Sequence, residues 1–203
     1  MMRDFLAELD AQRFDDHRFY HHSRINQSLH LISALSFVFA YALLLVDPAM
    51  AAIVAWCFSM TTRQAGHFFF EPRGFDMVNQ VSDEFKEAVK VGYNIRRKIV
   101  LMAIWLAIPL VLWFDSTLLG MFAPADDLRG WMNNLGLTWL YLGIAGWVVR
   151  MMQLWIQQSF LTALAWGVKI ITDPFHDIVL YWRAPLHLAR GEWIDPMHHV
   201  QPR

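Results

Sequence analysis

Four apolar runs, separated by polar stretches, divide the chain into candidate helices. The first two runs cover 27–46 and 49–70, and the others cover 98–119 and 135–171. A membrane-spanning helix needs about 20 mostly apolar residues, which each of these ranges supplies once polar flanks are included. We therefore expect an all-α fold, in which residues 1–203 form one integral membrane domain of about four transmembrane helices.

The fourth run is too long for a simple crossing. Helix over all of 135–171 would measure about 55 Å at about 1.5 Å per residue. Neither glycine nor proline flanks Arg150 directly, so we expect one span with a projecting end rather than a helical hairpin. Pro174 is expected to end this helix near Thr172, because proline disfavours helical backbone in the residue before it.

Composition agrees with a membrane location. Hydrophobic residues make up 56% of the chain and charged residues 17%, against about 45–50% and about 25% in soluble domains. The formal net charge of −1 gives no indication of a nucleic-acid partner. The single cysteine, Cys57, excludes an intrachain disulfide and a cysteine-rich metal site.

Basic residues predict the orientation. Fifteen of the seventeen lie before residue 27, within 62–98, or from Lys169 onward, whereas the 115–134 loop has only Arg129. The positive-inside rule then places both termini in the cytoplasm, as an arm over 1–26 and a tail over 172–203. All nine histidines consequently fall on or near the cytoplasmic side.

The stretch YHHSRINQSLH at the start of the first run concentrates polar side chains. On one continuous helix His22, Asn26 and His30 share a face, but His22 and His30 would lie about 12 Å apart along the axis. They can bind one metal ion only if the helix begins after His22. Ser23 is a good N-cap and would leave His22 in the preceding coil; a start at Asn26 is the alternative.

Two further groups of ionisable residues are expected on the cytoplasmic side. His67 and Glu71 are four residues apart, so they meet on one helical face and could form half of a metal site or simply satisfy each other. Ionisable groups at a membrane edge are candidate functional residues. Near Pro174, the residues Asp173, His176 and Asp177 emerge there as well. His187, His198 and His199 lie in a polar tail without a recognisable pattern.

A polar stripe occurs inside the last apolar run. Arg150, Gln153 and Gln157 are spaced to share one helical face. Arginine can bind a carboxylate through two parallel hydrogen bonds, so this stripe is a candidate substrate-binding site. Internal hydrogen bonding within the bundle is the alternative interpretation.

Taken together, Y-H-H-x-x-x-N-x-x-x-H and the later G-H-x-x-x-E resemble the membrane 2-hydroxy fatty acid dioxygenase family, over about residues 18–72. The family's fungal enzyme uses ferrous iron and oxygen to remove one carbon from 2-hydroxy fatty acids. The resemblance implies functional roles for His22, Asn26, His30, His67 and Glu71. Three segments that follow the motif residues, SR, LISALS and PRGFD, depart from the family pattern, and these departures concern the substrate rather than the metal ligands.

The resemblance implies an Fe(II) dioxygenase with a lipid and molecular oxygen as substrates. We expect it in the bacterial inner membrane, and the basic residues place its site at the cytoplasmic face. Histidine and carboxylate ligands with open positions are typical of non-haem Fe(II) oxygenases. We expect His30, His67 and His176 as ligands, joined by His22 if the helix begins after it. Glu71 is expected as ligand or base, and Asn26 as a residue that orients a histidine.

Two other functions fit the same residues. A haem-binding protein would need two histidines at equal depth on different helices, as His30 and His67 could be. A membrane scaffold or interaction protein, with or without self-association into a homo-oligomer, would need none of the histidines for chemistry. Metal content distinguishes the first two functions from the third.

Overall fold

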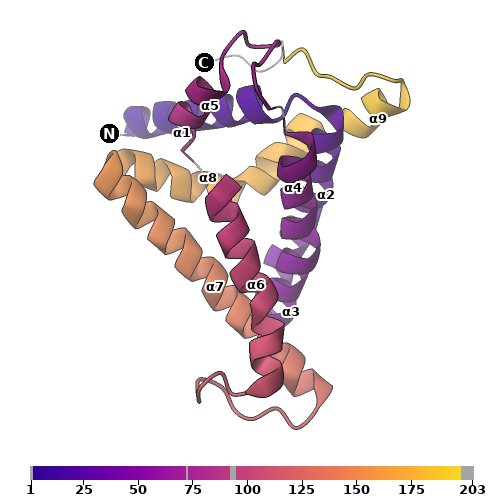
Figure 1. Ribbon diagram of the computed structural model, residues 1–203, viewed down its shortest axis with the longest axis vertical. Coiled ribbons are helices and arrows are strands. Elements are labelled where there is room, and N and C mark those ends of the chain that lie inside the picture. The colour runs from indigo at the N-terminus through magenta and orange to yellow at the C-terminus, as the bar shows by residue number, and fades with distance from the viewer. Residues whose placement is uncertain (1, 72, 92–94, 198–203) are drawn as a thin grey trace.

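The computed structural model describes residues 2–71, 73–91 and 95–197, and the regular elements in these ranges are helices (Figure 1). The C-terminal pair His198 and His199 lies outside the described residues. The α-helices are α1 (Met2–Tyr20), α2 (Arg24–Leu44), α3 (Pro48–Val54), α4 (Thr61–Ala65), α5 (Asp83–Val89), α6 (Ile95–Phe114), α7 (Leu128–Gln157), α8 (Phe160–Tyr181) and α9 (Ala184–Ala189), and the π-helical segments are η1 (Ala55–Met60) and η2 (Gly66–Phe70).

Three of these helices are long and apolar enough to cross a membrane, which indicates a membrane protein. They cover Arg24–Leu44, Arg96–Phe114 and Leu128–Gln157. The predicted second span, 49–70, is helical as well, but it consists of α3, η1, α4 and η2 joined end to end. π-Helical turns within α-helices are frequent at functional sites.

Side-chain caps set where the helices begin. The Ser23 hydroxyl accepts a hydrogen bond from the backbone N–H of Asn26, so α2 starts immediately after Ser23. Of the two predicted helix starts, Ser23 is therefore correct and Asn26 is not. Asp47 caps α3 in the same way through the Met50 amide, with Pro48 at the first helical position. The α1–α2 connection is consequently only three residues long and contains both His21 and His22.

The expectation for the fourth apolar run is wrong in two respects. The range 135–171 is two helices, because α7 ends at Gln157 and α8 begins at Phe160, capped by the Ser159 hydroxyl. Gln158 has a non-helical backbone between them. Pro174 does not end the second helix near Thr172; α8 continues through it to Tyr181. Pro174 is buried, and packing of this face overrides the local preference.

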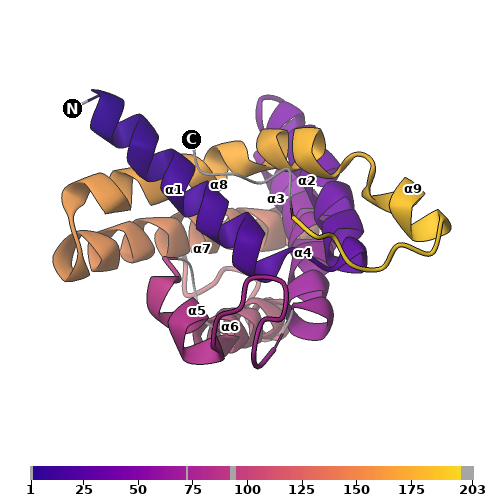
Figure 2. The ribbon, with the colours of Figure 1, turned by 90° about the horizontal axis from the view of Figure 1, so that it is seen from above.

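The helices form a wedge with a wide and a narrow end (Figure 1). At the wide end α1 crosses α8, as the view from above also shows (Figure 2). From there α2, the 48–70 helix, α6 and α7 extend towards the narrow end, where the 115–127 connection lies. The fold therefore places α1, α8 and the α1–α2 connection at one end of the bundle.

Close packing holds the walls of the wedge together. The stacked rings of Trp56 and Trp105 have centroids 5.8 Å apart, and the Trp56 indole donates to the Trp139 carbonyl at 2.9 Å. Gly136 lets α7 approach α3 closely, because a Cβ there would lie 2.3 Å from the Ala49 carbonyl oxygen. The apolar faces of α2 and α6 remain outside this core, with large exposed side chains such as Phe39 and Leu110.

Candidate metal centre

Three buried histidines from three segments converge next to α1 and α8. His21 comes from the α1–α2 connection, His30 from α2 and His67 from η2. One ligand nitrogen of each lies within 4.8 Å of those of the other two. The ring centroids are 4.2 Å apart for His21 and His30, 4.9 Å for His30 and His67, and 5.2 Å for His21 and His67.

The sequence folds His21 back by fixing the carbonyls on either side of it. The Asn26 amide donates to the Tyr20 carbonyl at 2.8 Å. The neighbouring Gln27 amide donates to the His21 carbonyl at 2.8 Å and to Asp195 at 2.8 Å. These bonds anchor the short connection to the first turn of α2, which carries His21 towards His30.

In each of the three rings the Nδ1 atom is engaged by an oxygen. His21 Nδ1 lies 2.9 Å from the Asp16 carbonyl, and because a carbonyl can only accept, that nitrogen carries a proton. His67 Nδ1 lies 2.7 Å from the Glu71 carboxylate, and His30 Nδ1 lies 3.5 Å from the Asp177 carboxylate. Carboxylate or carbonyl partners of this kind fix the tautomer of metal-binding histidines.

The Nε2 atoms are thereby left as lone-pair donors. Those of His21 and His30 face each other at 3.1 Å, with no proton between them when both neutral rings carry their proton on Nδ1. Burial lowers the pKa of His21, which favours the neutral ring. Two nitrogens that bind one ion at about 2.1 Å each lie roughly 3–4 Å apart. The arrangement therefore fits a transition-metal ion that relieves two opposed lone pairs.

Glu71 supports His67 rather than adding to the triad. Its carboxylate accepts from His67 Nδ1 and, through the other oxygen, from Lys90 at 3.0 Å. Burial opposes ionisation of Glu71, but the His67 hydrogen bond and the nearby charges of Lys90 and Lys98 outweigh it and lower its pKa to about 2. A carboxylate that stays ionised raises the basicity of the imidazole it holds.

A buried charge network connects His30 to α8. Asp177, whose carboxylate faces His30, accepts from Arg63 of α4 at 3.0 Å. One turn earlier on α8, Asp173 accepts from Lys169 at 2.6 Å, and Lys169 also donates to Asp16 of α1 at 2.9 Å. Charges taken out of water in this way need close partners, and here the partners tie α1, α4 and α8 together around the centre.

His22 lies on the other side of the connection. Its side chain is buried, with Nδ1 3.9 Å from the Asp76 carboxylate, and its carbonyl accepts from the Asp195 amide at 2.8 Å. The two neighbouring histidines therefore have different surroundings, with His21 beside His30 and His22 beside Asp76. The structure brings His21, not the predicted His22, to His30 and His67.

His176 is also not part of the triad. Its ring is half-buried and lies against His17 of α1, with centroids 5.1 Å apart. The next residue, Asp177, contacts His30, and on an α-helix successive side chains point about 100° apart. His17 itself is buried and bonds through Nδ1 to the Tyr181 hydroxyl.

The predicted substrate-binding stripe takes part in the packing of α7. Arg150 is buried and donates to the Val91 carbonyl and, at 3.4 Å, to Gln153. Gln157 is exposed at the end of α7. The alternative of internal hydrogen bonding therefore describes Arg150 and Gln153 better than a ligand site.

Asn26 and Gly66 meet at the point where α2 approaches the π-helical turn. A Cβ on Gly66 would lie 2.1 Å from the Asn26 amide oxygen and 3.4 Å from the His30 ring. The absence of a Cβ at Gly66 lets Asn26 lie against this turn, which places His67, the next residue, beside His30. Asn26 thus positions His21 through the Tyr20 carbonyl rather than by bonding to an imidazole.

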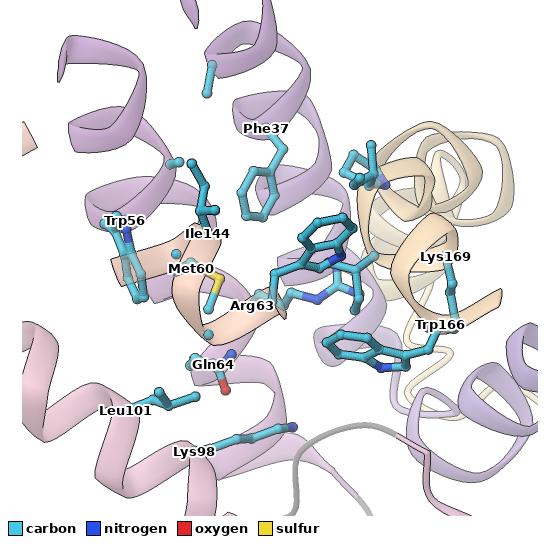
Figure 3. Close-up of a pocket in the computed structure, with 18 of the residues that line it drawn as sticks. Phe37, Trp56, Met60, Arg63, Gln64, Lys98, Leu101, Ile144, Trp166 and Lys169 are labelled. Atoms are coloured by element: carbon cyan, nitrogen blue, oxygen red, sulfur yellow. The ribbon is translucent and has the colours of Figure 1, made fainter. Parts of the chain in front are cut away.

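A cavity of about 740 Å³ lies within the bundle (Figure 3), and His67 is one of the residues that line it. Its walls are largely aromatic and aliphatic, with Phe37, Trp56 and Leu101 among them. Its charged and amide side chains include Arg63, Gln64, Lys98 and Lys169. Sites for small molecules are commonly cavities of about 300–1,000 Å³ with apolar walls and a few polar groups.

Sequence reasoning missed His21 as a ligand candidate, and it missed the supporting roles of Asp177 and Arg63. The adjacent histidines His21 and His22 were both available as ligands. Only the path of the α1–α2 connection decides which of them faces His30 and His67. Arg63 had a usable signal, because it precedes His67 by four residues and so lies near the same helical face.

Comparison with known proteins identifies no relative. No protein-family model matches the chain, and neither a curated protein nor a solved structure matches it. Any function must therefore be inferred from the residues of the site.

Proposed function

We propose that the protein is an Fe(II)-dependent membrane dioxygenase that shortens a 2-hydroxy fatty acid or a related lipid by one carbon. The observation that carries this proposal is the convergence of three buried imidazoles whose Nδ1 atoms are engaged by oxygens and whose Nε2 atoms are free to bind an ion.

His21, His30 and His67 would hold the metal. Three neutral imidazoles suit Fe(II), and also Zn(II) or Cu(II), and a facial set of three protein ligands leaves positions open for a substrate and oxygen. Bound iron would supply the site at which oxygen and a 2-hydroxy acid meet. The overall reaction balances as 2-hydroxy acid plus O₂ giving the acid one carbon shorter, carbon dioxide and water.

The protein's own residues would orient the ligands and keep the site dry. Glu71 and Asp177 hold the rings of His67 and His30, and the Asp16 carbonyl holds that of His21. All three imidazoles are buried, so bulk water has little access to the reacting groups. The cavity that His67 lines would receive the lipid, with its chain along the apolar walls.

The membrane setting suits such a substrate. The candidate spans α2 and α6 contribute to the cavity through residues such as Phe37 and Leu101, so a lipid could reach it from the bilayer. The triad lies at the wide end of the wedge, opposite the 115–127 connection, which is poor in basic residues. We therefore place the site at the cytoplasmic face of an inner membrane, with four helical crossings if the 48–70 helix also spans.

The geometry favours an ion over a haem. The three rings lie edge to face with centroids 4.2–5.2 Å apart, which leaves no space for a macrocycle between any two of them. A haem would also give the purified protein a Soret band. A scaffold without chemistry would bind neither iron nor substrate.

The proposal is tested by oxygen uptake. Protein purified without oxygen and loaded with Fe(II) should consume oxygen when given a 2-hydroxy fatty acid and release the acid shortened by one carbon. His67→Ala should abolish both. Protein that takes up Fe(II) stoichiometrically but consumes no oxygen with 2-hydroxy acids of any chain length would overturn the dioxygenase function while leaving the metal centre intact.

A further inference from the structure

Four cationic side chains line the cavity, and three of them have carboxylate partners. Arg63 donates to Asp177 at 3.0 Å, and Lys169 donates to Asp173 and Asp16. Lys90 donates to Glu71 at 3.0 Å and to Glu87 at 3.3 Å. The charges of these three cations are therefore neutralised within the fold.

Lys98 is the fourth cation and differs from the others. Among the described residues its ammonium group has no hydrogen bond and no ion pair, although it lines a cavity with mostly apolar walls. Its side chain extends from α6 into the cavity (Figure 3). A half-buried ammonium group without an ion-pair partner favours an anionic ligand, because a charge taken partly out of water is costly.

Gln64 provides a second unpaired polar group in the same cavity. It is 8% exposed, and its amide oxygen is buried without a hydrogen-bond partner in the described part of the chain. Its side chain and that of Lys98 enter the cavity from α4 and α6 (Figure 3). Buried amides are nearly always hydrogen-bonded, so an unpaired amide oxygen in the same cavity as an unpaired cation indicates a polar ligand.

The position of these two residues relates the ligand to the metal centre. Gln64 precedes His67 by three residues on the same helical face, and His67 lines the same cavity. The charge of Lys98 is one of those that lower the pKa of Glu71, the partner of His67. An anion held by Lys98 and Gln64 would therefore lie beside His67.

We propose that Lys98 and Gln64 form the head-group subsite of the cavity and bind the carboxylate of a single-chain amphiphile. This proposal rests on the proposed function and assigns the residues that select its substrate. The ammonium group would pair with one carboxylate oxygen, while the Gln64 amide N–H donates to the same head group and its oxygen accepts from a neighbouring hydroxyl. The chain would follow Met60, Leu101 and Ile144 along the apolar walls.

The head group is a monoanion rather than a phosphate. Among the described lining residues Lys98 supplies one positive charge that no ion pair engages, and the carboxylate of Asp15 lines the same cavity. A dianionic phosphate would gain one ion pair but would be repelled by that carboxylate. A carboxylate matches the single cation.

Binding can be measured without metal, which separates this proposal from catalysis. Several cavity-lining residues are tryptophans, among them Trp56, Trp139 and Trp166, so a bromine-labelled long-chain fatty acid that enters should quench the intrinsic fluorescence. The titration uses the full-length protein in nanodiscs after treatment with a chelator. The corresponding brominated fatty alcohol and alkyl phosphate serve as comparison ligands.

We expect the fatty acid to bind at least tenfold more tightly than the alcohol, since a hydrogen bond to a charged group is involved. Lys98→Met should remove this preference without weakening alcohol binding, and Lys98→Arg should retain most of it. Gln64→Leu should reduce the preference partly. The control Arg97→Met changes an exposed cation on the next position of α6, outside the cavity lining, and should have no effect.

Equal binding of acid and alcohol by the wild type would overturn the subsite, as would an unchanged acid preference in Lys98→Met. Tighter binding of the alkyl phosphate would overturn the assignment to a carboxylate. Iron content is measured on the same preparations before chelation. A protein that binds the acid through Lys98 but holds no iron would refute the proposed dioxygenase and leave the subsite standing.

Discussion

His21 and His30 face each other through their Nε2 atoms at 3.1 Å, although they come from opposite sides of a helix start. The Nδ1 atoms of both rings are engaged, by the Asp16 carbonyl and the Asp177 carboxylate. When both rings carry their proton on Nδ1, these two nitrogens are acceptors that a bound metal ion would join, and burial disfavours a second, charging proton on His21. This contact is the main reason to propose a metal ion at His21, His30 and His67.

Replacing Glu71 should weaken the metal centre without removing it. Glu71→Ala should reduce metal affinity by about 10–100-fold, as is typical when the partner of a metal-bound histidine is lost. Glu71→Gln keeps an oxygen that can accept from His67 Nδ1 and should show a smaller loss. Anaerobic Fe(II) titration of the chelator-treated protein measures both. Identical affinities in wild type and Glu71→Ala would show that Glu71 does not orient His67.

The same carboxylate predicts a pH dependence. Because the pKa of Glu71 is lowered from 4.5 to about 2, its ionised form stabilises the folded state above about pH 4.5. This contribution is lost only as the pH falls towards 2. The difference in unfolding temperature between wild type and Glu71→Gln should therefore be largest at neutral pH and should shrink below pH 4. A difference that grows on acidification would contradict the lowered pKa.

Gly66→Ala should disrupt the approach of α2 to η2. The added Cβ would lie 2.1 Å from the Asn26 amide oxygen, so Asn26 must move and release the Tyr20 carbonyl that precedes His21. We expect a destabilisation of about 1–3 kcal/mol, typical of overpacking, together with reduced iron content. Gly143→Ala is the matched control, because a Cβ there meets the Trp56 ring at 3.9 Å, an ordinary van der Waals distance. Thermal unfolding in detergent and metal analysis distinguish the two variants.

Asp177 and His176 are adjacent in sequence but should behave differently. Asp177→Ala leaves the Arg63 guanidinium without its closest carboxylate and His30 without its Nδ1 partner. Breaking a buried ion pair costs about 3–5 kcal/mol. His176→Ala removes a half-buried ring from outside the triad and should cost less than about 1 kcal/mol. Comparable losses of stability and iron in both variants would argue for His176 as a ligand.

Arg150→Met should affect stability but not lipid recognition. The substitution removes the hydrogen bond to the Val91 carbonyl, and an unsatisfied buried group costs about 1–3 kcal/mol. Arg150 is not among the cavity-lining residues in the described ranges, so binding of the brominated fatty acid per folded molecule should match the wild type. A selective loss of acid binding would restore the substrate role that the sequence pattern suggested.

The sequence predicted the helices far better than the details of the site. Apolar runs and caps such as Ser23 are local features, so the start of α2 and the existence of the long helices could be read directly. The break at Gln158 and the passage of α8 through Pro174 depend on packing and could not. Both errors concern α8, whose charged face is buried against α1 and α4.

The choice of ligands shows the same limit. His30 and His67 were expected as ligands and lie together, because each is positioned by the helix that carries it. Whether His21 or His22 faces the other two ligands depends on the path of the three-residue connection. The side chains of Asn26 and Gln27 set this path through hydrogen bonds to the Tyr20 and His21 carbonyls. Periodicity carries no information on that path. Asp177 rather than His176 faces His30 because ion pairs fix the rotation of α8 about its axis. These pairs join Asp177 to Arg63 of α4 and Lys169 to Asp16 of α1.

The most direct test of the metal centre is the iron content of two neighbouring variants, His21→Ala and His22→Ala, purified without oxygen beside the wild type. If His21, His30 and His67 hold the ion, the wild type should contain close to one iron per chain. His21→Ala should then lose most of this iron, and His22→Ala should retain it. Full iron content in His21→Ala, or loss confined to His22→Ala, would contradict the assignment.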